Sequence, residues 1–192
     1  IHIDCHGNSD GIEMTDKNGN VEFAIWHEIS DKFRDIYRES KMKPVLCMSS
    51  CKGFNAIKMV PEKASCPYEH VSGSFEEIKF GDSFYAYKEF YEMILQDKDP
   101  VKAGAEIHNN PKYKDMKFIC LSSSGLFELA SKGYLEKKRT PDEIKKEKEN
   151  TIQNAVKAGV PLTDQVLAYI DYSYSDAGIS EYMDEWRSIF FS

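Results

Sequence analysis

The sequence predicts an α/β domain with a mostly parallel sheet, followed by a helical C-terminal extension. The first 51 residues have the pattern strand, helix, strand, which is the unit that joins two parallel strands. Further segments with strand or helix patterns continue to about residue 133, and only helical patterns follow them. We therefore expect an α/β core over residues 1–133 and a helical extension over residues 134–192.

The composition is that of a folded chain and argues against two classes of partner. The 192 residues suffice for one domain with a substantial core. The 32 acidic and 25 basic side chains give a net charge of −7, which disfavours binding to nucleic acid or to anionic lipid. No run of about 18 apolar residues is present, so we expect no membrane association. The five cysteines include no CxxC pair, which favours reduced thiols and a cytoplasmic location.

The first four elements follow from periodicity and turn residues. Apolar and polar residues alternate over residues 1–5, which predicts a strand that ends at His6-Gly7. The pair Asn18-Gly19 predicts a hairpin within residues 11–24. Apolar residues at helical spacing predict an amphipathic helix from Ile25 to about Ser40. The run "VLCMSSC" at residues 45–51 has no polar alternation, as expected of a strand covered on both faces.

The middle of the chain continues the same pattern. A short helix is expected after Gly53, and "YEHVS" at residues 68–72 predicts another strand. Aromatic residues spaced by three or four predict a helix over residues 82–96, with Asp82 as its N-cap. The segment "DPVKAGAEIHNN" predicts a shorter helix, and residues 117–125 predict a strand that closes on a Ser/Gly turn.

The extension is predicted to be entirely helical. Thr140, Pro141 and Glu143 form a capping-box pattern at the start of a charged helix. Two more helical stretches cover residues 163–171 and 178–190. We find no internal repeat and no low-complexity linker.

A histidine and a cysteine end two strands that are expected to be neighbours. A cysteine acts as a nucleophile only as a thiolate, or beside a base that takes its proton. In a parallel βαβ unit the ends of both strands lie at the carboxyl edge of the sheet, where open α/β sheets bind ligands. We therefore expect His6 and Cys51 to lie close together as a catalytic pair. The amides of Gly7 and Cys51 could form an oxyanion hole, and Ser49 and Ser50 leave room for a substrate.

The remaining cysteines and histidines have simpler interpretations. Cys5, Cys47 and Cys120 lie on strands with apolar neighbours, so we expect them in the core. A zinc site made of Cys5, His6, Cys47 and Cys51 is an alternative, but these residues lack the short paired spacings of structural zinc sites. We expect no metal and no cofactor. His70 could line the cleft.

The two motifs "IHIDCHG" and "VLCMSSCKG" resemble those of the caspase-like (clan CD) cysteine peptidase superfamily, and most closely its bacterial CHAT-like members. The resemblance covers about residues 1–110, with Gly53 one residue nearer the cysteine than in those members. It implies a three-layer sandwich around a mostly parallel six-stranded sheet, with the histidine after the third strand and the cysteine after the fourth. Because the sequence opens inside the first predicted strand, two N-terminal strands would be missing, and an N-terminal fragment or regulatory domain could complete the sheet.

The resemblance implies a cysteine endopeptidase in which Cys51 attacks the scissile carbonyl of a protein or peptide substrate and His6 acts as acid and base. Asp10, near His6, favours a basic residue at P1, and the loop over residues 73–79 could be a regulated element. Two other hypotheses remain open at this stage. The chain could be an inactive caspase-like scaffold that works by binding, or a thiol hydrolase or acyltransferase that does not cleave proteins.

Overall fold

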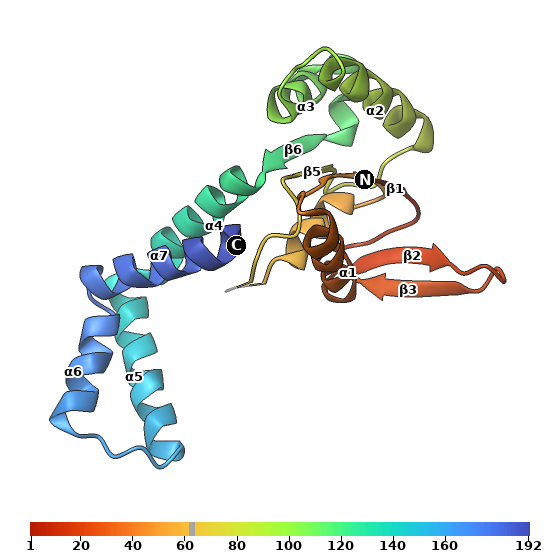
Figure 1. Cartoon of the computed structure of the whole chain (residues 1–192). Helices are drawn as coiled ribbons and strands as arrows, with labels where there is room; N and C mark the ends of the chain where they lie inside the picture. Colours follow the sequence, from red (N-terminus) through yellow and green to blue (C-terminus); the bar gives the residue numbers. More distant parts are fainter. Residues whose placement is uncertain (62–63) are drawn as a thin grey trace. The chain divides into compact units, whose positions relative to one another are not determined.

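The computed structural model describes residues 1–61 and 64–192. The chain divides into two compact units, Ile1–Leu126 and Phe127–Ser192. The first unit is an α/β structure and the second is helical (Figure 1). The division lies at residues 126/127, inside a helix, whereas the sequence patterns place it at residues 133/134.

The first unit is built on a four-stranded sheet with the strand order β1-β4-β5-β6. The strands are β1 (His2–Asp4), β4 (Val45–Ser49), β5 (His70–Gly73) and β6 (Ile119–Ser122). β1, β4 and β5 are parallel, and β6 pairs with β5 in the antiparallel direction. The prediction of an α/β fold with a mostly parallel sheet is therefore confirmed.

Helices cover the sheet because β4 is apolar on both faces. On one face lie α2 (Phe80–Ile94) and α3 (Pro100–Asn109), whose buried residues form a core with Cys47 and Cys120 of the sheet. The 3-10 helix η1 (Gly53–Met59) contacts β4 and β5 and packs on α1 (Trp26–Ser40). Successive residues of a strand face opposite sides, so the odd-numbered residues of β4 lie on the α2 side.

The core on the α2 side is rich in aromatic rings. Tyr87, Phe90 and Phe118 contact one another edge-to-face or tilted, with centroids 5.2–6.1 Å apart. Around them lie Ala86, Ala103, Ile107, Tyr113 and Met116, the last two from the 3-10 helix η2 (Pro111–Met116). The prediction that the aromatic stripe of α2 is core holds for Tyr87 but not for Phe80 and Phe84, whose side chains are exposed.

A two-stranded hairpin follows β1 directly. It consists of β2 (Gly11–Thr15) and β3 (Val21–Ile25), and it leads without a gap into α1 (Figure 1). The turn has Gly19 with a φ of 85°, a conformation that suits glycine. Both the predicted hairpin and the predicted helix are confirmed.

Two local predictions are wrong. α2 begins at Phe80 with Lys79 at the N-cap position, and Asp82 lies in its first turn instead of capping it. After β6 the chain does not turn, because Ser123 starts the helix α4 (Ser123–Lys138). The Ser122 Oγ accepts the Gly125 amide at 3.1 Å, so the serines that suggest a turn instead begin a helix.

The second unit contains the rest of α4 together with α5 (Pro141–Lys157), α6 (Asp164–Ser173) and α7 (Asp176–Phe191). Thr140 caps α5 by accepting the Glu143 amide at 3.3 Å, as the sequence pattern predicts. The unit has its own aromatic core, in which Phe127 lies 5.1 Å from Trp186 and 5.2 Å from Phe190, measured between ring centroids. Among the residues that the structure describes, no helix combines the length and the apolar character needed to cross a membrane.

Candidate functional site

The ends of β1 and β4 bring His6 and Cys51 to the same edge of the sheet. The two strands pair in parallel, with Asp4 opposite Ser49. Continuing this register by two residues places His6 opposite Cys51, on the α2 side of the sheet. Both residues line one pocket of about 330 Å³. The structure thus brings together the two residues that the sequence pairs as catalytic.

The pocket has a mixed lining from four segments of the first unit. β1 and the residue after it supply Asp4 and Cys5, and β4 with its following residue supplies Ser49 and Ser50. The far wall consists of Ile78, Phe80 and Ser83 from α2 and the segment before it. The Ser49 and Ser83 hydroxyls hydrogen-bond to each other at 2.7 Å. The pocket therefore combines hydroxyl groups and apolar side chains with the two candidate catalytic side chains.

Cys51 is partly exposed, and its sulfur contacts the backbone of the segment that leads into α2. The Ile78 amide donates to Sγ at 3.5 Å, and the Ile78 carbonyl oxygen lies 3.7 Å from the same sulfur. The backbone of Ile78 therefore contacts the sulfur through both its amide and its carbonyl group.

Three of the other cysteines are unsuited to nucleophilic chemistry. Burial raises the thiol pKa of Cys5 and of Cys66 to about 11, and that of Cys120 to about 12. For Cys5 the carboxylates of Asp4 and Glu13 add to the effect of burial. Such thiols remain protonated at neutral pH. Cys47 is 1% exposed and belongs to the core, as predicted.

His6 is exposed, and its position is fixed through the backbone. Its carbonyl oxygen accepts the Glu13 amide at 2.9 Å, and Gly7 pairs with Ile12 in a short antiparallel bridge. The imidazole makes no hydrogen bond to any residue that the structure describes. The ring is therefore available for a proton donor or acceptor from a substrate or from the Cys51 thiol.

The backbone at the two motif ends is tightly packed. A Cβ atom at Gly7 would lie 3.0 Å from the Cys51 carbonyl oxygen and 3.3 Å from Ser50 Cβ. Only glycine therefore lets the segments that follow β1 and β4 approach each other this closely. Within the described residues, the amides of Gly7 and Cys51 have no hydrogen-bond acceptor. Two unpaired amides at adjacent strand ends have the chemistry of an oxyanion hole.

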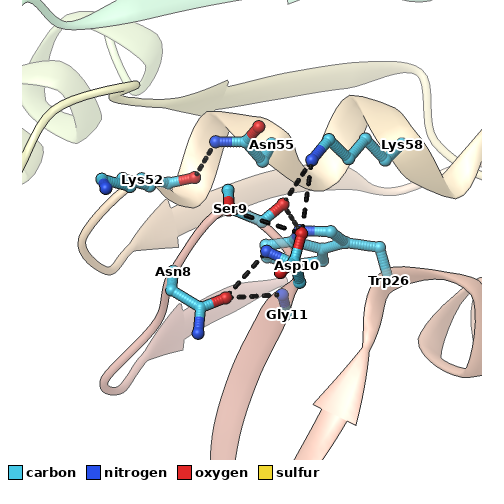
Figure 2. A network of polar contacts seen from close by, with 8 residues as sticks. All are labelled: Asn8, Ser9, Asp10, Gly11, Trp26, Lys52, Asn55 and Lys58. Atoms are coloured by element: carbon cyan, nitrogen blue, oxygen red, sulfur yellow. Dashed lines mark hydrogen bonds and ion pairs between the residues drawn. The ribbon is translucent and has the colours of Figure 1, made fainter.

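The loop after His6 is anchored to η1 (Figure 2). The Asn8 Oδ1 accepts the amides of Asp10 and Gly11, at 2.7 and 3.3 Å. Lys58 of η1 donates to the Ser9 carbonyl oxygen at 2.6 Å and lies 3.7 Å from Asp10 Oδ1.

Trp26 holds the same loop from α1. Its indole Nε1 donates to the Ser9 carbonyl oxygen at 3.2 Å, and its backbone amide donates to the Asp10 carbonyl oxygen at 3.1 Å. Since Trp26 is buried, the loop is tied to a rigid part of the unit. His6-Gly7 is thereby fixed on its C-terminal side as well as through β1.

The predicted substrate-binding residues divide into two groups. Ser49 and Ser50 line the pocket, and the Ser50 Oγ is buried without a hydrogen-bond partner among the described residues. Asp10 does not line the pocket, because its carboxylate lies beside Lys58 on the outer side of the loop. His70 is opposite Val45 in the β4–β5 register, at the amino end of β4 and away from the pocket. The hypothesis that His70 lines the cleft therefore needs correcting.

Sequence reasoning missed Asp4, Ile78 and Ser83. Asp4 could have been found, because alternation along β1 places it on the same face as His6. Ile78 and Ser83 carry no such signal, since only the tertiary position of the segment before α2 brings them to Cys51.

The segment from Ser74 to Lys79 is fastened to the turn that follows Cys51. The amides of Lys52 and Phe54 donate to the carbonyl oxygens of Glu76 and Ser74, both at 2.9 Å. The Glu76 carboxylate also pairs with Lys117 at 2.6 Å. These bonds hold Ile78 against the Cys51 sulfur.

Comparisons with known proteins add no family. Neither a scan against protein-family models nor a search of curated proteins returns a match. Over residues 1–61 and 64–192, no three or more His, Cys, Asp or Glu side chains gather in a way that could hold a metal ion. The pocket and its residues are therefore the basis for a functional hypothesis.

Proposed function

We propose that the chain is a cysteine endopeptidase that hydrolyses peptide bonds of a protein substrate through the pair His6 and Cys51. The observation that carries the proposal is that both side chains line one pocket at the carboxyl edge of the sheet. The caspase-like resemblance of the two motifs supports the same reaction. The five free cysteines support a reducing location such as the cytoplasm.

The proposed reaction has two halves, and His6 moves a proton in each. The Cys51 sulfur attacks the scissile carbonyl while its proton passes to His6, and the amides of Gly7 and Cys51 stabilise the oxyanion. His6 then gives the proton to the leaving amine, and a thioester to Cys51 remains. A water molecule, deprotonated by His6, attacks the thioester and releases the carboxylic acid, and the thiol takes its proton back.

A specific contact favours a second candidate, the inactive scaffold. The Cys51 sulfur is in contact with the Ile78 backbone, and the structure shows no hydrogen bond between this sulfur and His6. Such a contact suits a chain that works by binding, or a peptidase whose thiol is released when a partner, a ligand or processing moves residues 74–79. The scaffold and the regulated peptidase therefore differ in one observable: only the peptidase cleaves a protein once residues 74–79 have moved away from Cys51.

The test compares single-residue variants of the full chain. Cleavage of an unfolded protein and of a mixed peptide library would be followed by mass spectrometry for Cys51→Ala and His6→Ala. Cys5→Ala is the matched control, since Cys5 also lines the pocket but has a thiol pKa of about 11. We expect both catalytic variants to lose cleavage by at least about a thousandfold, as in other nucleophile–base pairs, and Cys5→Ala to retain it.

Two results would contradict the proposal. Cleavage that survives either catalytic variant would show that the pair is wrong. Acylation of Cys51 by a small activated ester without any proteolysis would indicate a thiol hydrolase or acyltransferase. Circular dichroism and thermal melting of each variant would separate loss of chemistry from loss of fold.

A further inference from the structure

The pocket beside Cys51 contains one acidic side chain and no basic one apart from His6. Its lining residues are Asp4, Cys5, His6, Ser49, Ser50, Cys51, Ile78, Phe80 and Ser83. No lysine or arginine is among them, and His6 is the proposed acid and base. The charge of the pocket is therefore set by Asp4.

The position of Asp4 follows from the parallel pairing of β1 and β4. Asp4 is opposite Ser49, and His6 and Cys51 each lie two residues further along. Since side chains two residues apart on a strand share a face, Asp4 lies on the same face as the candidate catalytic pair, two residues before His6 along β1. It lines the same pocket as the sulfur that would attack a scissile carbonyl.

The Asp4 carboxylate is exposed, and it makes no ion pair and no hydrogen bond with any residue that the structure describes. Its charge acts on His2, whose pKa it tends to raise, while burial lowers that pKa more. The Asp10 carboxylate, by contrast, lies next to Lys58. An unpaired carboxylate that lines a pocket is free to bind a cation from a ligand.

The rest of the lining suits a long side chain with a charged end. Ile78 and Phe80 provide apolar walls for a methylene stem, and Phe80 is 70% exposed, so part of its ring is free to be covered. The Ser49 and Ser83 hydroxyls next to Asp4 keep lone pairs that can accept N–H groups. A volume of about 330 Å³ lies at the small end of the range for ligand pockets, which matches one side chain better than several.

From this geometry we infer that the pocket lined by Asp4 binds the lysine or arginine side chain of a substrate and makes the site selective for cleavage after a basic residue. Asp4 is the specificity-determining residue. The inference rests on the proposed function only in taking Cys51 as the place of the scissile carbonyl.

The test has a binding arm that needs no catalysis. The full chain carrying Cys51→Ala would be titrated, with NMR shifts as readout, with a short blocked peptide ending in arginine amide. The control ligand is the same peptide with citrulline, which is neutral and nearly the same shape. We expect the arginine peptide to bind at least about tenfold more tightly, because hydrogen bonds to a charged partner are stronger than neutral ones.

Two variants assign the preference to Asp4. Asp4→Asn should bring the affinity ratio of the two peptides close to one, with little change for citrulline. Asp10→Asn, which removes a nearby carboxylate outside the pocket, should keep the ratio. A ratio near one before mutation, or a ratio that Asp4→Asn leaves unchanged, would overturn the inference.

The cleavage arm separates this inference from the proposed function. In the chain with Cys51 intact, we expect Asp4→Asn to lower kcat/KM about tenfold for peptides with arginine or lysine at the cleaved bond, and to leave their citrulline and norleucine counterparts nearly unchanged. An equal loss for all four peptides would show that Asp4 only positions His6. Binding that depends on Asp4 without any cleavage would leave the inference standing and refute the peptidase.

Discussion

Selective alkylation of Cys51 tests the choice of nucleophile without knowledge of a substrate. Iodoacetamide reacts with thiolates, so the relative rates of the five cysteines depend on exposure and on the thiolate fraction of each. Cys5 is the critical comparison, because it is partly exposed and lines the same pocket as Cys51. Its pKa of about 11 lies above the ordinary thiol value of about 9.

The size of the effect follows from that difference in pKa. At pH 7.5 a thiol with the ordinary pKa of about 9 is about 3% ionised, whereas a thiol of pKa about 11 is ionised to about 0.03%, roughly a 100-fold difference. A thiolate of higher pKa is also the stronger nucleophile, which offsets part of this difference in ionisation. We still expect Cys51 to react more than about tenfold faster than Cys5. Cys47, Cys66 and Cys120 are buried and should react only when the chain opens.

The assay is a time course of labelling at pH 7.5 under native conditions, with peptide mapping by mass spectrometry. We expect the Cys51 peptide to be modified first, and the Cys5 peptide to follow at least about tenfold more slowly. In denaturant all five should react at similar rates, which serves as the control. Equal native rates for Cys5 and Cys51, or faster labelling of Cys5, would refute the assignment of the nucleophile.

Three further predictions concern the backbone at Gly7, the aromatic core and the pKa values of the buried thiols. Gly7→Ala should lower the rate of cleavage about a hundredfold, because the new Cβ would lie 3.0 Å from the Cys51 carbonyl oxygen and push the backbone at Cys51 out of place. Gly133→Ala is the control, since Gly133 has open space around it and its substitution should leave the rate unchanged. Initial rates of cleavage measure both. Phe90→Ala should reduce the free energy of unfolding by about 3–5 kcal/mol in urea titrations, whereas Phe84→Ala, at a site 56% exposed, should cost under about 1 kcal/mol. The free energy of unfolding should fall between about pH 9 and 11. The unfolded chain releases the protons of the Cys5, Cys66 and Cys120 thiols near pH 9, whereas the folded chain holds them until about pH 11 or 12. Equal denaturation midpoints at pH 8.5 and 10.5 would contradict this.

Much of the first unit could be predicted from local patterns. The alternation of residues 1–5, the helical spacing over residues 25–40 and the apolar run over residues 45–51 each specify one element, and together they specify a parallel pair of strands joined by a helix. The proximity of His6 and Cys51 follows from that pairing, since topology alone places both strand ends at one edge. The start of α4 at Ser123 was not predictable in this way, because serines favour turns and helix starts for the same reason.

The walls of the pocket could not be predicted, because they depend on the path of residues 74–79. Nothing in the sequence of this segment indicates that its carbonyl groups pair with the amides of Lys52 and Phe54. Those bonds connect two irregular segments, and irregular segments have no periodicity to read. The contact between Ile78 and Cys51 therefore appears only when the tertiary structure is known.

The register between β1 and β4 is the feature on which the whole site depends. In the observed register Asp4 is opposite Ser49, and by continuation His6 is opposite Cys51. A slip of one residue would bring Cys5 opposite Cys51 and turn His6 and Asp4 to the α1 side of the sheet. Contacts at both ends of β1 oppose such a slip. His2 on the α2 side hydrogen-bonds Tyr91 at 2.7 Å, and the Gly7–Ile12 bridge fixes the chain beyond His6. The contacts that hold β1 in place thus also determine that His6 and Asp4, and not Cys5, lie on the same face of the sheet as Cys51.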